Sequence, residues 1–266
     1  MSWSLVDADS RRKLAWYAVK RAYAPITINA ERFGSETRDA AANKYSDVAI
    51  TRTTGLRIWT SNLTTRPVSA SLHLRIFPVN EGENVYEERT NVWLEPNRSQ
   101  EVRTILPLPM SVQGWSGEDA GYKKREGLRA NSVVALTLYD DDGRTLARFV
   151  EWPQPLRHLD LRPGGLNVGF ERLATFASTS ASVSAATSTS SKDGKKQENV
   201  LKLTLAAKVP LKAVELYGND EDLELSDNCI DLVPDEDVEV FVRRVDGEWV
   251  NEEDVLWRHL GEVAGT

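Results

Sequence analysis

The sequence predicts a mainly β protein, with two immunoglobulin-like β-sandwiches preceded by one N-terminal helix. Hydrophobic residues recur at helical spacing between Arg11 and Tyr23. From Ile26 onward, apolar and polar residues alternate in short runs, as they do in strands that bury one face. Turn residues separate these runs, and many short strands with turns between them are typical of antiparallel sandwiches.

The helix is expected to start after a cap at Asp9 or Ser10, because either side chain can accept a hydrogen bond from the free amides of a first helical turn. It should end at Ala24, since Pro25 forces the following chain out of helical geometry. A helix of roughly three and a half turns is marginally stable in water without packing. Contacts with other elements are therefore needed.

The expected helix is apolar over most of its circumference. Lys13, Tyr17, Lys20 and Arg21 fall in one wedge, and apolar residues cover the remaining arc of roughly 200°. A helix that lies on one surface needs an apolar stripe of only about 100°. We therefore expect cover on two sides, one supplied by the β sequence and the other by a structure outside this chain. The apolar arc holds Leu14, Ala15, Trp16, Ala18, Val19, Ala22 and Tyr23.

The first sandwich is expected between residues 25 and 157, after an N-terminal segment of residues 1–24. Acidic and glycine residues suit a tight turn at Asp140-Asp141-Asp142-Gly143, which predicts a hairpin. Charged and glycine residues at 114–129 predict a mobile surface loop. The seven expected strands cover residues 26–31, 56–61, 68–76, 84–94, 99–106, 131–139 and 145–150.

The second sandwich is expected between residues 158 and 266. Residues 151–155 close the first sandwich, and Trp152 is expected to fill the junction between the two. The segment 177–199 is rich in Ser, Thr, Ala and Lys and cannot bury enough apolar area to offset chain entropy, so it predicts a disordered insertion. The expected strands cover residues 166–170, 199–206, 211–217, 223–225, 230–233 and 238–242.

Charge is distributed unevenly along the 266 residues, whose net charge is −7. Residues 199–266 carry 17 acidic and 6 basic side chains, a net charge of −11. This acidic segment argues against nucleic acid or an anionic membrane as a partner. The sequence holds no apolar run near the ~20 residues of a membrane span, and its start does not resemble a signal peptide.

The residue types that form metal and catalytic sites are scattered. Cys229 is the single cysteine, and His73, His158 and His259 lack ligand spacing, so we expect no metal and no cofactor. The acidic clusters are interpreted as solvated surface rather than as catalytic groups. They consist of Asp220, Glu221, Asp222, Glu224, Asp235, Glu236 and Asp237.

Three motifs follow one another along the chain. The first is Trp3-Ser4-Leu5-Val6-Asp7 with Ala24-Pro25, the second is Trp152-Pro153-Gln154-Pro155, and the third is Ser226-Asp227-Asn228 with Asp231-Leu232-Val233-Pro234. Together they resemble the β-mannosidases of glycoside hydrolase family 2, with the closest match to the fungal B-type enzymes. In that family the motifs belong to the last strand and helix of the catalytic barrel, to the linker between two terminal domains, and to the terminal domain. Arg11, Lys13, Ala15 and Tyr17 also fit the first motif.

The chain also departs from the family pattern. The family usually has an aromatic pair after the aspartate and prolines around the lysine, and glycine after the last proline. The residues that stand at these places are Ala8, Asp9, Arg12, Leu14 and Asp235.

The resemblance implies an accessory role. The family removes terminal non-reducing β-D-mannose through a covalent intermediate, using two glutamates of a (β/α)8 barrel. Neither glutamate has a counterpart here, so the chain alone is expected to be inactive, with its N-terminal helix left over from a barrel that it braces. By the same resemblance, Trp3 and Asp7 line the substrate pocket, or Trp3 only packs at the barrel mouth. The resemblance favours a cytoplasmic over a secreted protein.

Other readings remain open. Trp59 can stack on a sugar, or it can pack between domains together with Trp16 and Trp152. The sequons at Asn62 and Asn97 matter only in a secreted protein. The competing function is a free-standing module that binds carbohydrate or protein. Such a module should cover Trp16, Val19 and Tyr23 with its own sheets, whereas an accessory region should leave part of that helix face bare.

Overall fold

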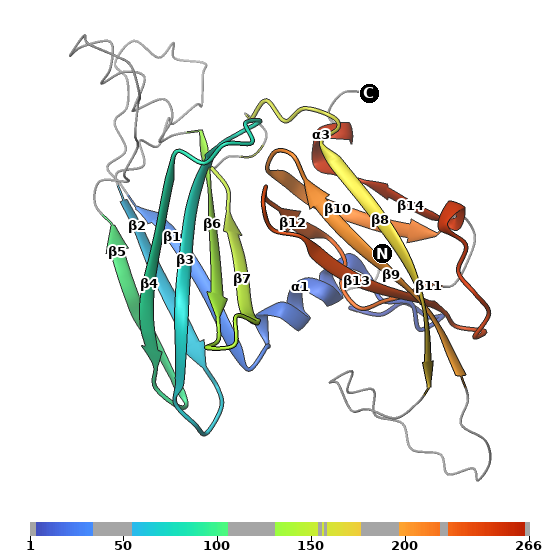
Figure 1. Cartoon of the computed structure of the whole chain (residues 1–266), viewed down its shortest axis with the longest axis horizontal. Helices are drawn as coiled ribbons and strands as arrows, with labels where there is room; N and C mark the ends of the chain where they lie inside the picture. Colours follow the sequence, from blue (N-terminus) through green and yellow to red (C-terminus); the bar gives the residue numbers. More distant parts are fainter. Residues whose placement is uncertain are drawn as a thin grey trace.

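The computed structural model describes residues 4–33, 55–105, 131–153, 156, 159–176, 197–218 and 223–263. Two β-sandwiches lie side by side, and a helix lies between them (Figure 1). The loop predicted at 114–129 and residues 177–196 of the predicted insertion lie outside the described residues. Within the described part, no helix has the length and hydrophobicity of a membrane span.

The first sandwich follows directly from the N-terminal helix and consists of two antiparallel sheets. One has the order β1-β2-β5 and the other the order β4-β3-β6-β7. The predicted hairpin is confirmed as the pair β6 and β7. The elements are α1 (Leu14–Ala22), β1 (Ile26–Phe33), β2 (Gly55–Asn62), β3 (Val68–Pro78), β4 (Tyr86–Leu94), β5 (Arg98–Ile105), β6 (Ser132–Tyr139) and β7 (Thr145–Glu151).

The second sandwich pairs a sheet of order β11-β13-β9-β8 with a sheet of order β12-β10-β14. Strand β9 starts at Gln197, within the range predicted to be disordered, because it pairs along the whole of β8. Strand β14 and helix α3 were not predicted. The elements are β8 (Leu166–Phe176), β9 (Gln197–Ala207), β10 (Leu211–Gly218), β11 (Leu223–Leu225), β12 (Ile230–Leu232), β13 (Val238–Arg244), η2 (Glu252–Asp254), β14 (Val255–Arg258) and α3 (Leu260–Val263).

Each sandwich buries its own core, as the alternating patterns predict. Leu56, Leu72 and Leu136 belong to the first core, and Leu203 and Val240 belong to the second. A third cluster joins the two sandwiches. It consists of Phe77, Val133, Ala135, Trp152 and Val233.

The predicted start of the helix is wrong. Lys13 is the N-cap of α1, and no side chain caps the helix. Instead, the carboxylate of Asp7 accepts hydrogen bonds from the amides of Asp9 (3.0 Å) and Arg11 (2.8 Å). Ser10 has a φ of 65°, in the left-handed region. Residues 7–11 therefore form a closed turn of their own, which excludes Asp9 and Ser10 from capping.

Candidate functional site

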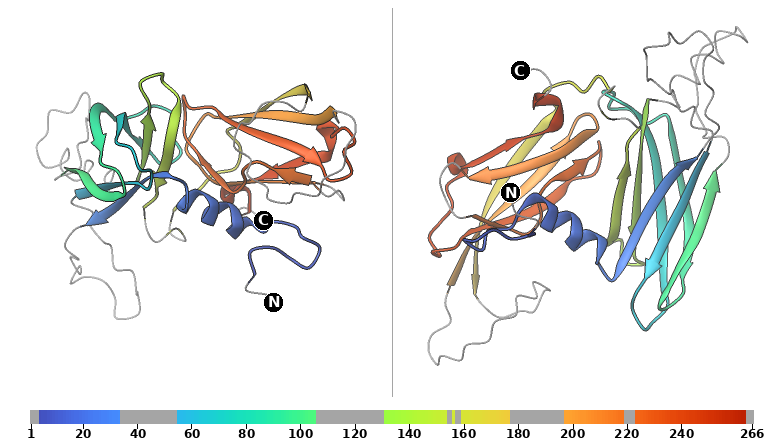
Figure 2. Two further views of the ribbon diagram at one scale, coloured as in Figure 1. Left: turned by 90° about the horizontal axis from the view of Figure 1, so that it is seen from below. Right: turned by 180° about the vertical axis from the view of Figure 1, so that it is seen from behind.

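Helix α1 connects the two sandwiches. Its C-terminal end leads into β1 of the first sandwich (Figure 2). Its side chains contact the second sandwich. The guanidinium of Arg21 forms an ion pair with Asp227 and donates hydrogen bonds to the carbonyl oxygens of Asn228 and Cys229, both at 3.0 Å. Lys20 Nζ donates to the carbonyl oxygen of Ser226 at 2.7 Å. The basic wedge thus binds the loop between β11 and β12.

Tyr17 is the buried residue of α1. Its exposed fraction is 2%, and it belongs to the core of the second sandwich. The ring of Trp16 meets it edge-on, with 5.1 Å between centroids, and the guanidinium of Arg12 lies 4.5 Å from the centroid of Trp16. Burial raises the pKa of Tyr17, and the positive charge of Arg12 opposes this. The wedge that holds Tyr17 is therefore the packed face of the helix.

A second side of α1, next to the packed face, is exposed. Leu14, Ala15, Ala18 and Ala22 are exposed, and Tyr23, at the end of the helix, is 80% exposed. Trp16 and Val19, on the borders of this arc, are half-buried. Single exposed apolar residues are common on protein surfaces, but here four of them share one side of a helix. We call Leu14, Ala15, Ala18 and Ala22 the bare arc.

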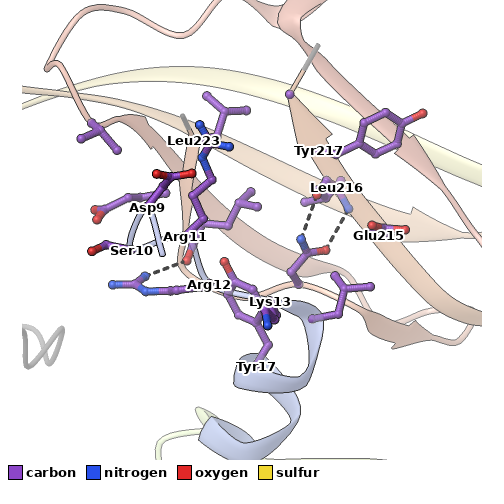
Figure 3. Close-up of a pocket in the computed structure, with 16 residues that line it drawn as sticks. Asp9, Ser10, Arg11, Arg12, Lys13, Tyr17, Glu215, Leu216, Tyr217 and Leu223 are labelled. Carbon is purple, nitrogen blue, oxygen red and sulfur yellow. Dashed lines mark hydrogen bonds between the residues drawn. The ribbon is translucent and has the colours of Figure 1, made fainter. Parts of the chain in front are cut away.

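A pocket of about 410 Å³ lies between the N-terminal segment and the edges of β10 and β11 (Figure 3). Arg12 Nη1 donates to the carbonyl oxygen of Leu225 at 3.4 Å along its wall. The amide of Asn228 bonds both backbone groups of Leu216 at 2.8 Å. The bond from Arg12 attaches the N-terminal segment to the second sandwich, and the bonds of Asn228 hold the loop before β12 against β10.

The two glutamates that line the pocket are already paired. Glu215 accepts a hydrogen bond from Arg258 Nε at 2.6 Å, and Glu224 accepts one from Arg243 Nε at 2.6 Å. A retaining glycosidase needs a nucleophilic carboxylate beside a second carboxyl group that donates a proton. In the described lining of this pocket, Glu215 and Glu224 are each bonded to an arginine, and Asp9 is a third carboxyl group.

The carboxylate of Asp7 has a structural role in this chain. The two hydrogen bonds that its carboxylate accepts close the turn at residues 7–11, and Asp7 does not line the pocket. Trp3 lies outside the described residues. A role of Trp3 and Asp7 in substrate binding therefore stays a prediction.

Trp152 lies in the seam between the sandwiches. It is buried among Phe77 and Val133 of the first sandwich and Val233 of the second. Its Nε1 donates a hydrogen bond to Asp231 Oδ2 at 3.0 Å. The carboxylate of Asp231 also receives Lys212 Nζ at 2.7 Å and the amide of Ala213 at 2.9 Å. The indole thus contacts both sandwiches and a fully bonded carboxylate.

Trp59 lies on the outward face of β2. It is half-buried there, opposite Asn29 of β1 and Glu101 of β5. Whether it stacks on a sugar or packs between domains stays a prediction.

The two sequons differ in the fold. Asn62 is buried, and its side-chain amide donates to the carbonyl oxygens of Arg66 (2.8 Å) and Leu94 (3.1 Å). Asn97 is exposed in the turn after β4, with a φ of 50°. In the folded chain, the amide of Asn62 is therefore already used in structure.

The interpretation of Glu236 as solvated surface is wrong. Its side chain is only 9% exposed, while Asp235 and Asp237 beside it are exposed. Glu236 accepts hydrogen bonds from Arg148 Nε at 2.6 Å and from Thr137 Oγ1 at 3.0 Å, and it forms an ion pair with Arg75. A run of three acidic residues gives no sign of which one turns inward, so the sequence did not distinguish Glu236.

Two family models match separate parts of the chain. A mannosidase Ig/CBM-like domain matches residues 54–158, and an Ig-fold domain matches residues 183–257. One match falls in each sandwich, which confirms the immunoglobulin-like architecture. The domain boundaries expected at residues 24/25 and 157/158 stay predictions.

Named proteins that are similar in sequence agree with these domain matches. β-Mannosidase B of Thermothelomyces thermophilus is 30% identical over 244 residues, which cover 91% of this chain and 24% of that protein. β-Mannosidase B of Aspergillus fumigatus is 25% identical over 250 residues, again 91% of this chain and 24% of that protein. This chain therefore spans about a quarter of the length of these curated relatives.

Solved structures share the fold. The β-D-mannosidase of Dictyoglomus thermophilum superposes with a TM-score of 0.63 at 16% identity, over 97% of this chain and 24% of that one. The exo-chitosanase CsxA of Amycolatopsis orientalis superposes with a TM-score of 0.53 at 14% identity, over 99% of this chain and 27% of that one. From its domains and its relatives, the chain carries mannosidase-type immunoglobulin-like domains and corresponds to the C-terminal immunoglobulin-like region of the β-mannosidases of glycoside hydrolase family 2.

Proposed function

We propose that this chain is the accessory region of a β-mannosidase and that its N-terminal helix docks a catalytic barrel. The observation that carries the proposal is the bare arc of α1, which holds Leu14, Ala15, Ala18 and Ala22. Alanines let a second backbone approach a helix closely, and Leu14 adds apolar area that water otherwise covers. The relatives, which are about four times as long, support a larger protein around this region.

The chemistry of hydrolysis belongs to the barrel in this proposal. By resemblance, the barrel carries both glutamates and releases terminal non-reducing β-D-mannose. In the pocket beside α1, Glu215 and Glu224 each accept a hydrogen bond from an arginine of this chain. The accessory region holds the barrel in place and shapes the entrance for substrate.

A free-standing binding module is the competing function. It requires the chain's own sheets to cover the apolar side of α1. Tyr23 is 80% exposed and the bare arc is open, which favours the accessory role.

An activity assay tests the proposal. The purified 266-residue chain should release no mannose from an aryl β-D-mannoside above the uncatalysed rate. A chimera in which this chain replaces the corresponding region of the Thermothelomyces thermophilus β-mannosidase B should hydrolyse the same substrate. Its control is that enzyme with the region deleted, which should be inactive. Enzyme-like hydrolysis by the isolated chain would contradict the proposal, and so would a deletion variant as active as the chimera.

A further inference from the structure

The outward face of the sheet β4-β3-β6-β7 carries a binding site for a carboxylate. Arg75 lies on β3, Thr137 on β6 and Arg148 on β7, three neighbouring strands of this sheet. Thr137 and Arg148 are directly opposite each other in the β6–β7 register, and Thr137 is opposite His73, two residues before Arg75. Side chains two apart on a strand share a face. We call Arg75, Thr137 and Arg148 the Glu236 site.

The carboxylate that binds at this site comes from the other sandwich. Glu236 lies in the connection between β12 and β13, and its two carboxylate oxygens accept the bonds from Thr137 and Arg148 together with the ion pair to Arg75. Arg75 Nη1 also donates to the carbonyl oxygen of Pro234 at 2.8 Å. Between these two contacts, Asp235 has a φ of 58°, a left-handed turn that directs Glu236 toward the sheet. The connection is therefore bound to Arg75 on both sides of Asp235.

Removal of the carboxylate leaves buried charge behind. Arg75 Nε and Arg148 Nη2 are buried without a hydrogen-bond partner among the described residues, so Glu236 supplies the compensation for both guanidinium groups. A buried ion pair adds little net stability over an apolar contact, but loss of one partner is costly because the other charge stays desolvated. If the interface between the two sandwiches opens, water can solvate the guanidinium groups again, and the cost of the unpaired buried charge falls. The apolar cluster around Trp152 continues to hold the sandwiches together.

We propose that Glu236 is a latch that fixes the angle between the two sandwiches. The latch also sets the direction of α1, because α1 runs directly into β1 of the first sandwich while Arg21 binds the loop before β12 of the second. A change of angle therefore pulls the helix away from one of its two attachments. The consequence for barrel docking rests on the proposed function above, whereas the latch itself does not.

The test uses the complete chain without any mannoside. Glu236→Gln keeps the shape of the side chain and removes its charge. The matched control is Glu239→Gln, three residues further along, whose carboxylate is 51% exposed and pairs with Lys202. Small-angle X-ray scattering should show a broader distribution of interatomic distances for Glu236→Gln alone. Amides of β6, β7 and β12 should exchange hydrogen at least about tenfold faster in that variant, while amides of β2 and β9 keep their rates.

A second variant separates the latch from general stability. Thr137→Val removes the hydrogen bonds to Glu236 and keeps all charges, so the exchange rates at the seam should rise by a smaller factor than in Glu236→Gln. If Glu236→Gln and Glu239→Gln give the same scattering and exchange, the latch is contradicted. It is equally contradicted if β2 and β9 lose protection together with the seam, since Glu236 would then stabilise the fold rather than the angle. An inactive chimera with a normal latch result would count against the proposed function alone.

Discussion

Replacement of Trp152 by alanine should lower the free energy of unfolding by about 3–5 kcal/mol, the usual cost of removing a large aromatic side chain from a core. Trp152 is buried against Phe77 and Val233, and its Nε1 bonds Asp231. The variant leaves a cavity in the seam and one acceptor of Asp231 unused, although Lys212 and Ala213 still bond that carboxylate. Urea unfolding followed by circular dichroism measures the change.

The matched control is Trp93→Ala. Trp93 is 55% exposed on β4 and lies outside the seam cluster. Exposed substitutions of this kind usually change stability by less than about 0.5 kcal/mol. Equal losses of unfolding free energy in the two variants would contradict a specific role of Trp152 between the sandwiches.

Introduction of a charge into the bare arc should disable the chimera but not the isolated chain. Ala18 is exposed at the centre of the arc. In the chain alone, Ala18→Glu should change the free energy of unfolding by less than about 0.5 kcal/mol, because the new carboxylate stays in water. Against a docked barrel, the same carboxylate would be buried without a partner. That costs more than about 1.4 kcal/mol, so the yield of active chimera should fall tenfold or more.

The control for this variant is Asn91→Glu, which adds the same charge at an exposed position of β4. The chimera that carries Asn91→Glu should stay active. Full activity of the Ala18→Glu chimera would mean that the barrel does not contact the arc.

The strands could be predicted because their signal is local. In β2, Leu56, Ile58 and Thr60 are buried while Arg57 is exposed, so the alternation in the sequence is the alternation in the fold. The same holds for the β6–β7 hairpin, whose acidic and glycine turn follows directly from the residue types. The apolar arc of the helix already predicted a partner outside the chain, and the resemblance to a family then identified that partner as a catalytic barrel.

The contacts between distant segments could not be predicted in this way. The helical wheel placed Tyr17 with Lys20 and Arg21 in a polar wedge, and a polar wedge is normally the solvent face. Here these side chains face the second sandwich, because loop carbonyls and Asp227 more than 200 positions away in the chain satisfy them. The same limit applies to Glu236, whose partners come from three strands of the other sandwich.

Local turn chemistry explains the remaining error. Asp7 precedes the predicted caps Asp9 and Ser10 and takes the amides of Asp9 and Arg11 first. Ser10 adopts a φ of 65°, Arg12 forms a β-bridge with Val6, and Lys13 is still extended, so the helix starts at Leu14. An aspartate carboxylate can accept hydrogen bonds from the amides two and four residues ahead. Asp7 is visible in the sequence and could therefore have predicted this turn.

Hydrogen exchange of the α1 amides tests the docking of a barrel most directly. The exchange rates at residues 14–22 are measured in the isolated chain and in the chimera with the Thermothelomyces thermophilus enzyme. If the bare arc docks the barrel, these amides should exchange at least about tenfold slower in the chimera, since the docked helix must detach before it opens. Equal rates in the two proteins would contradict the account.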